Sequence, residues 1–207
     1  VNQLIGVKIA ANDHRDSCLD YKELQRIGAE ARVAGMISGK SGHVTIHMGS
    51  GKFYFNQIND ALKYSNLPIT IFRPTHVNRD KKLFDEALEF AENGGYIDLT
   101  SGINKDFPDS LAYKMAKEKN VLDKITFSSD GFGSWSNYDD EGNLIEIGYS
   151  PVDTGIKAIK EIVDDGENLE GAIKPFTSNV AKVLKLDREV GFIKEGYIAN
   201  LVLLDEI

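Results

Sequence analysis

The chain has 207 residues, of which 42% are hydrophobic and 27% are charged, and this composition is typical of a globular domain with a substantial core. The formal net charge is −8, with acidic and basic residues mixed along the sequence. No block of lysine or arginine forms a basic stripe, so we expect no nucleic-acid partner.

The one cysteine, Cys18, excludes an internal disulfide and fits a reducing compartment, for which the cytoplasm is the default. Only His14 stands near it as a helper, so we interpret Cys18 as a free thiol rather than as a nucleophile. No apolar run approaches the ~20 residues that a membrane span needs, and no signal peptide opens the chain. The sequence therefore predicts a cytoplasmic protein with no membrane partner.

Short apolar segments alternate with helical patterns along most of the chain. The segments with strand character are residues 4–11, 43–48, 69–77, 96–100 and 125–129. Helical patterns lie behind a cap at Asp20, around 58–62, and over 81–92, 110–119, 152–164 and 177–185. This order predicts an α/β fold in which five βα units form a parallel sheet. Residues 139–143 are interpreted as a solvated turn.

The number of strands is too small for a closed barrel, which has eight strands and typically ~250 residues. Five strands alone would leave two bare sheet edges, which are a liability. We therefore interpret residues 1–187 as strands 4–8, with their helices, of a partial (β/α)8 TIM-type barrel. Residues 188–207 would leave the barrel. A strand-like run at 199–205, ending without a partner, also indicates a piece of a longer protein.

Four reactive side chains stand at or just beyond predicted strand ends, where such barrels build active sites: Lys8, His47, His76 and Asp130. Histidine and carboxylate are common zinc ligands, and a metal lowers the pKa of bound water towards neutrality. A carboxylate beside that water can take its proton and pass it to a leaving nitrogen. The set predicts a metal-dependent hydrolase that attacks an amide carbonyl.

Each of these residues also has a purely structural interpretation. His47 and His76 fit core histidines with backbone partners, and Asp130 fits a helix cap. Lys8 is harder to explain in this way, because a lysine buried in an apolar strand must be paired or neutralised. The occurrence of all four at strand ends favours a site. His43 is left out, because it stands ~13 Å before His47 along a strand.

Two arginines, Arg15 and Arg79, lie in loops beyond the first and third predicted strands. Single loop arginines are commonly solvated, but guanidinium groups bind carboxylates through paired hydrogen bonds. Two of them near one predicted site favour a substrate-carboxylate clamp. His14, in the same loop as Arg15, is interpreted as a supporting residue rather than a metal ligand.

Several short motifs occur in a characteristic order. They are, in chain order, Val-Lys at 7–8, Asn-Asp-His-Arg at 12–15, His-Met-Gly at 47–49, Pro-Thr-His-Val-Asn-Arg at 74–79 and Ser-Ser-Asp-Gly-Phe-Gly-Ser at 128–134. Together they resemble the isoaspartyl (β-aspartyl) dipeptidase family of the amidohydrolase superfamily. The resemblance runs over most of the chain.

The resemblance implies a centre of two divalent metal ions, with Zn²⁺ as the expected metal. Lys8 would be carboxylated by CO₂ and would bridge the two ions, which turns a buried cation into an anionic ligand. His47 and His76 would bind one ion. Asp130 would bind the other ion and act as general acid and base.

The resemblance also implies a small dipeptide substrate and a homo-oligomeric parent enzyme. Arg15 and Arg79 would hold a substrate carboxylate. Ser134 would bind a polar end of the substrate, and this assignment rests on the family alone. Residues 188–207 resemble the return of the chain from the barrel to a small β-sandwich domain.

The family's His-x-His motif of the first strand does not occur in these residues, and neither do its glutamate, tyrosine and threonine of earlier loops. A site with half its ligands binds metal weakly, so we expect this chain alone to be poorly active. Two alternatives remain. One is another amidohydrolase, such as a dihydroorotase, hydantoinase or N-acyl deacetylase. The other is a non-catalytic barrel domain used for assembly.

Overall fold

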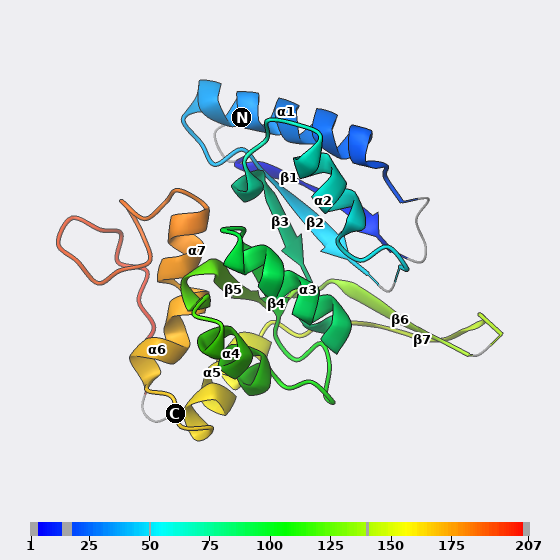
Figure 1. The fold of residues 1–207 in the computed structure, drawn as a ribbon. Helices are drawn as coiled ribbons and strands as arrows, with labels where there is room; N and C mark the ends of the chain where they lie inside the picture. Colours follow the sequence, from blue (N-terminus) through cyan, green and yellow to red (C-terminus); the bar gives the residue numbers. More distant parts are fainter. Residues whose placement is uncertain (1–3, 14–17, 50, 140, 205–207) are drawn as a thin grey trace.

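A five-stranded parallel sheet forms the centre of the computed structural model, which describes residues 4–13, 18–49, 51–139 and 141–204. The strands follow chain order across the sheet, as Figure 1 shows, so the expected α/β class is confirmed. They are β1 (Gly6–Asn12), β2 (His43–Met48), β3 (Phe72–Thr75), β4 (Ile97–Thr100) and β5 (Ile125–Ser128). Among the described strands, β1 and β5 each pair with one neighbour, so both edges of the sheet are open.

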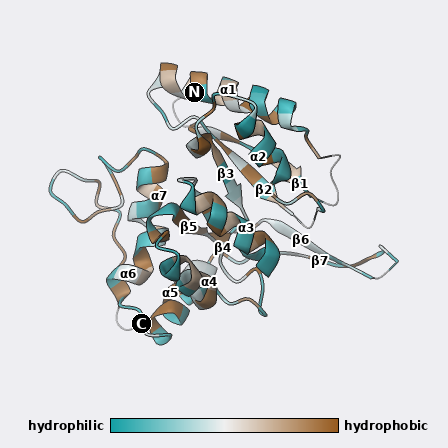
Figure 2. Ribbon diagram, in the orientation of Figure 1, coloured by the Kyte–Doolittle hydropathy of each residue, from teal (hydrophilic) through white to brown (hydrophobic). Residues whose placement is uncertain are grey.

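Helices return the chain between successive strands and continue after β5. They are α1 (Tyr21–Ser38), α2 (Asn56–Lys63), α3 (Lys81–Glu92), α4 (Asp109–Glu118), α5 (Thr154–Asp164), α6 (Leu169–Ile173) and α7 (Ser178–Val183). Figure 2 shows that the helices carry both apolar and polar stripes. Apolar side chains of the strands, such as Ile46 and Leu99, form one core cluster with helix residues such as Leu24 and Phe84.

Local signals in the sequence place several element ends correctly. The side chain of Asp20 accepts hydrogen bonds from the backbone N–H groups of Lys22 and Glu23, and forms a capping box at the start of α1. Helix α3 covers the predicted residues 81–92. The third strand is shorter than the predicted 69–77, because 3-10 turns flank it at Ile69–Ile71 and Val77–Arg79.

One face of the sheet carries a polar network, in which the buried carboxylate of Asp98 links three strands. Asp98 on β4 accepts hydrogen bonds from Thr75 Oγ1 at 2.7 Å on β3 and from Ser128 Oγ at 2.7 Å on β5. Thr126 Oγ1 donates to its other oxygen at 2.5 Å. Because buried polar groups need partners, this network fixes the relative positions of three strand ends.

An antiparallel hairpin that the sequence did not predict follows β5. Strands β6 (Ser134–Tyr138) and β7 (Leu144–Tyr149) pair with each other and project from the body of the fold (Figure 1). The expected turn at 139–143 is confirmed, for its described residues 139 and 141–143, as the tip of this hairpin. The side chain of Asp139 accepts hydrogen bonds there from the backbone N–H groups of Glu141 and Asn143.

The C-terminal residues differ from the strand expected at 199–205. Residues 199–204 form no strand, and Val202 and Leu203 are exposed. The physical reason is that none of the strands in the described residues pairs with this segment, so its backbone groups form no ladder. Within the described parts of the chain, none of the helices has the length and apolar character that crossing a bilayer would require.

Candidate active site at the carboxyl ends of the strands

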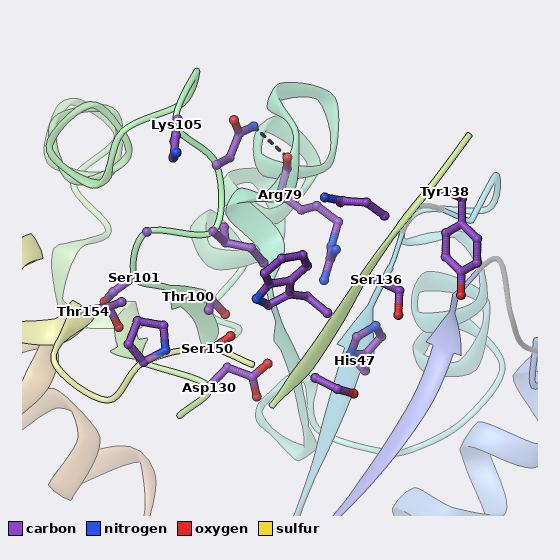
Figure 3. A pocket seen from close by; sticks show the side chains of 17 residues that line it. His47, Arg79, Thr100, Ser101, Lys105, Asp130, Ser136, Tyr138, Ser150 and Thr154 are labelled. Carbon is purple, nitrogen blue, oxygen red and sulfur yellow. Dashed lines mark hydrogen bonds between the residues drawn. The ribbon is translucent and has the colours of Figure 1, made fainter. Parts of the chain in front are cut away.

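A cavity of about 630 Å³ opens where the parallel strands end, and this volume is usual for a small-molecule site. Three predicted site residues, His47, Arg79 and Asp130, point into it from different elements in Figure 3. Ser134, at the start of the hairpin, also lines it. Arg79 and Lys105 supply positive charge to the lining and Asp130 supplies negative charge, so the cavity offers cationic partners to a ligand that carries a carboxylate.

His47, near the end of β2, is held by a carboxylate that the sequence analysis did not assign. Nε2 of His47 lies 3.0 Å from Oδ2 of Asp13, whose side chain is only 6% exposed. Asp13 directly follows β1. With a proton on Nε2 shared with this carboxylate, the lone pair of the ring lies on Nδ1, so Asp13 sets the tautomer of His47.

His76 lies beside His47, with the two ring centroids 4.6 Å apart. Its backbone adopts a φ of 65°, in the left-handed region that non-glycine residues occupy mainly under local constraint. Nδ1 of His76 lies 2.6 Å from Oγ1 of Thr100, while Nε2 is buried with no hydrogen-bond partner. One nitrogen fixed by a hydrogen bond and one without a partner is the arrangement of a metal-binding histidine.

The electrostatic surroundings keep His76 neutral. Burial, followed by the nearby His47, Arg79 and Lys8, lowers the pKa of His76 to about 3, and Asp13 opposes this shift. A neutral imidazole is the form that binds metal.

A buried amide joins the loop of His76 to the next strand. Asn78 accepts a hydrogen bond from the backbone N–H of Thr100 at 2.8 Å and donates to its carbonyl at 3.0 Å. Nδ2 of Asn78 also lies 3.3 Å from Oδ1 of Asp109, whose other oxygen accepts from the N–H of Gly102 at 2.8 Å. The Asn78 amide therefore fixes the backbone of Thr100, and the side chain of Thr100 contacts His76.

The structure corrects the assumption that Lys8 is buried. Its side chain is 55% exposed, and Nζ lies 3.9 Å from Oδ1 of Asp130. Lys8 is exposed because it stands on β1, at an open edge of the sheet. The inference that this lysine must be neutralised because it is buried therefore does not hold for the chain as described.

Asp130 occupies a tight turn just beyond β5. Its φ is 48°, and its carbonyl accepts a hydrogen bond from the N–H of Gly133 at 2.7 Å. A Cβ at position 133 would lie 2.7 Å from Cγ of Asp130, so only glycine fits beside this carboxylate.

The remaining predicted residues divide into three cases. The loop of Arg79 is fixed because its carbonyl accepts a hydrogen bond from Asn104 Nδ2 at 2.8 Å. Arg15 and His14 lie outside the described residues. His43 stands at the start of β2, away from the site as expected, with Nδ1 2.9 Å from Oγ of Ser41.

The metal centre implied by the resemblance is only partly represented. Among the described residues, no group of three or more His, Cys, Asp or Glu side chains is arranged to hold a metal ion. The buried Nε2 of His76 and the carboxylate-supported ring of His47 do fit metal ligands. The two histidines are thus suitable metal ligands, but the described residues bring together too few such ligands to hold a metal ion.

Sequence reasoning missed Asp13, Thr100 and Trp135. Asp13 stands within the 12–15 motif, in which only His14 and Arg15 were assigned roles from the sequence. Thr100 is the last residue of β4, and its position at a strand end was the available signal. Trp135 lines the cavity and directly follows Ser134, but the hairpin that carries it was not predicted.

No known protein-family model matches the sequence, whereas several solved structures do. β-Aspartyl dipeptidase from the thermophilic, keratin-degrading Fervidobacterium islandicum AW-1, in complex with β-Asp-Leu dipeptide, is 40% identical with a TM-score of 0.90. The match covers 96% of this chain and 53% of that chain. A second structure of the enzyme from this bacterium is 37% identical with a TM-score of 0.83, over 96% of this chain and 51% of that one.

A more distant match supports the fold alone. The phosphotriesterase homology protein from Escherichia coli, complexed with phosphate, is 14% identical with a TM-score of 0.54. It covers 80% of this chain and 54% of its own.

The five parallel strands and the antiparallel pair match half of an amidohydrolase fold, and the chain belongs to the amidohydrolase superfamily. Within that superfamily it is a homologue of β-aspartyl dipeptidase. The chain spans about half the length of these solved structures.

Proposed function

We propose that this chain supplies one side of a metal-dependent β-aspartyl dipeptidase site, and that the other ligands lie outside its 207 residues. The observation that carries the proposal is that His47, Arg79, Asp130 and Ser134 line one cavity. The homologue from Fervidobacterium islandicum AW-1 forms a complex with β-Asp-Leu. In this proposal, residues 1–187 correspond to strands 4–8 of the barrel, and residues 188–207 lead into a second, smaller domain.

The metal ligands of this chain would be Lys8, His47, His76 and Asp130, with Lys8 carboxylated by CO₂ in the assembled site. Two divalent ions, with Zn²⁺ the expected metal, would polarise the amide carbonyl and lower the pKa of water. His76 is suited to the task because it is neutral and its Nε2 is buried without a hydrogen-bond partner.

Proton transfer and substrate binding would be carried out by side chains of this chain. Asp130 would hold a proton at its carboxylate and pass it to the leaving nitrogen of the β-aspartyl amide. Arg79 would bind a substrate carboxylate in the positively charged part of the cavity. Ser134 would bind a polar end of the dipeptide, and Arg15 would complete the carboxylate clamp.

The proposal is tested by hydrolysis of β-Asp-Leu and α-Asp-Leu, with Zn²⁺ and bicarbonate supplied. The chain is assayed alone and after assembly with the segment of the Fervidobacterium enzyme that it does not match. We expect negligible turnover by the chain alone and selective cleavage of β-Asp-Leu by the assembled pair. His76→Ala and Asp130→Asn should each abolish this cleavage.

Three results would count against the proposal. Full turnover by the chain alone would show that the site is complete without further ligands. Hydrolysis of dihydroorotate or an N-acetyl substrate in preference to β-Asp-Leu would favour a different amidohydrolase. An assembled pair that binds zinc but hydrolyses none of these substrates would favour a non-catalytic barrel domain.

A further inference from the structure

We propose that Trp135 is a specificity-determining residue that receives the side chain of the leaving residue, so that the site prefers β-aspartyl dipeptides with an apolar second residue. The inference rests on the proposed function and extends it to one side of the substrate. It starts from the position of a partly exposed aromatic ring in a cavity whose predicted functional groups are polar.

The hairpin presents the indole through a cross-strand pair. Trp135 on β6 stands opposite Gly148 on β7. A Cβ at position 148 would lie within 3.0 Å of three atoms of the indole ring, so the ring lies directly over the glycine backbone. The missing side chain of Gly148 thus makes the space that the indole occupies.

The indole is not withdrawn into the core. Trp135 remains 39% exposed and lines the same cavity as His47, Arg79 and Asp130. Ile103 adds further apolar surface to the lining. Large aromatic rings that stay partly open beside polar groups are common anchors for ligand side chains.

A β-aspartyl dipeptide has a polar part and an apolar part, as the lining of the cavity does. Its carboxylates and amide suit the cationic and acidic residues, whereas the side chain of its second residue needs an apolar contact. Burial of a leucine side chain against the indole should favour β-Asp-Leu over β-Asp-Gly by about 10- to 100-fold in affinity.

The test compares the binding of β-Asp-Leu and β-Asp-Gly by calorimetry. It uses the chain assembled with the Fervidobacterium segment, loaded with Zn²⁺ and carrying Asp130→Asn in every variant, so that the dipeptides bind without being hydrolysed. Trp135→Ala should weaken β-Asp-Leu binding about tenfold or more and leave β-Asp-Gly binding almost unchanged. Trp135→Phe should retain most of the preference. Gly148→Ala leaves the tryptophan in the sequence but displaces its ring, so it should reduce the preference as well.

Tyr149→Ala is the matched control, because it removes an aromatic ring from the same hairpin that does not line the cavity. It should change neither affinity. Trp135 is the sole tryptophan of the chain, so with phenylalanine replacing any tryptophan of the added segment, emission reports this ring. We expect β-Asp-Leu to shift that emission more than β-Asp-Gly does.

The possible failures are distinguishable. Equal weakening of both dipeptides by Trp135→Ala would show that the ring supports the site without selecting the side chain. No change in either affinity would show that the ring does not contact the substrate. Both results overturn the inference and leave the proposed function standing. If the unaltered assembly binds neither dipeptide, the proposed function fails and the inference fails with it.

Discussion

Oδ2 of Asp13 lies 3.0 Å from Nε2 of His47, so a carboxylate just after β1 orients a histidine on β2. Partners of this kind fix the tautomer of a metal-binding histidine, and their loss typically costs 10- to 100-fold in metal affinity. We therefore expect Asp13→Ala to weaken Zn²⁺ binding by the assembled protein by about that factor.

Asp13→Asn should weaken it less, because an amide oxygen can still accept the proton of Nε2. Chelator competition measures the affinity. Asp153→Ala removes an exposed carboxylate that pairs with Lys157, and serves as the control. Equal Zn²⁺ affinity in Asp13→Ala and the unaltered protein would contradict this role.

Asn78 should matter for stability because its amide oxygen accepts from the buried N–H of Thr100. The Thr100 carbonyl would keep the N–H of Ile103 as a donor, so loss of the amide leaves one backbone group without a partner, which costs ~1–3 kcal/mol. We expect Asn78→Ala to lower the free energy of unfolding of the chain by about 2 kcal/mol. Urea denaturation measures the change.

A matched substitution separates this contribution from a general effect of losing an asparagine. Asn93 is exposed, and its side chain donates one hydrogen bond to the carbonyl of Glu89 at the end of α3. Asn93→Ala should cost much less, on the order of 1 kcal/mol or below. Similar losses in the two variants would show that the link between Asn78 and Thr100 adds little.

His43 makes the fold sensitive to acid. Burial, assisted by the nearby Arg73, lowers the pKa of His43 to about 4, whereas an unfolded histidine titrates near 6.5. The unfolded state therefore binds the proton first, and this contribution to stability is complete above pH ~6.5 and is lost as the pH falls towards 4. Its full size is about 3 kcal/mol.

The comparison is between the unaltered chain and His43→Gln, at pH 7.5 and pH 4.5, by urea denaturation. We expect the unaltered chain to lose about 2–3 kcal/mol more than the variant between these pH values. Parallel losses in both proteins would show that other groups account for the sensitivity to acid.

Gly133 leaves room for the carboxylate of Asp130. A methyl group at this position would collide with that carboxylate, so Gly133→Ala should displace Asp130 and reduce activity of the assembled protein at least tenfold. Turnover of β-Asp-Leu measures the effect. At Gly155 in α5, an added Cβ would stand 3.6 Å from the ring of Phe176, an ordinary contact. Gly155→Ala should therefore leave activity unchanged, and equal activity of both variants would exclude a displacement of Asp130.

The sequence allowed the parallel sheet to be predicted because local signals were strong there. Helix α3 has regular apolar spacing, and α1 begins at a capping box, so both were placed correctly. The hairpin was missed because β6 and β7 lack a clean alternation of polar and apolar residues and pair mainly with each other. Sequence spacing does not reveal an element of that kind.

The candidate site was predictable in part for a similar reason. His47 lies near the end of β2, and Arg79 and Asp130 lie in the turns after β3 and β5. Parallel strands bring their carboxyl ends together, so these side chains meet. The contacts of Asp13 with His47 and of Asn78 with Thr100 depend on loop paths, which spacing does not determine. The exposure of Lys8 was not predictable either, because it depends on which strands flank β1.

The two faces of strand β2 have different roles, because one packs into the core and the other faces the cavity. Val44, Ile46 and Met48 are fully buried against the helices, while His47 faces the cavity from between two of them. A single inserted or deleted residue within this strand would exchange the two sets, sending an isoleucine into the cavity and a histidine into the core. A substitution on one face of β2 therefore leaves the other face in place, whereas a change in length is compatible with this site only in the loops that join the strands and helices.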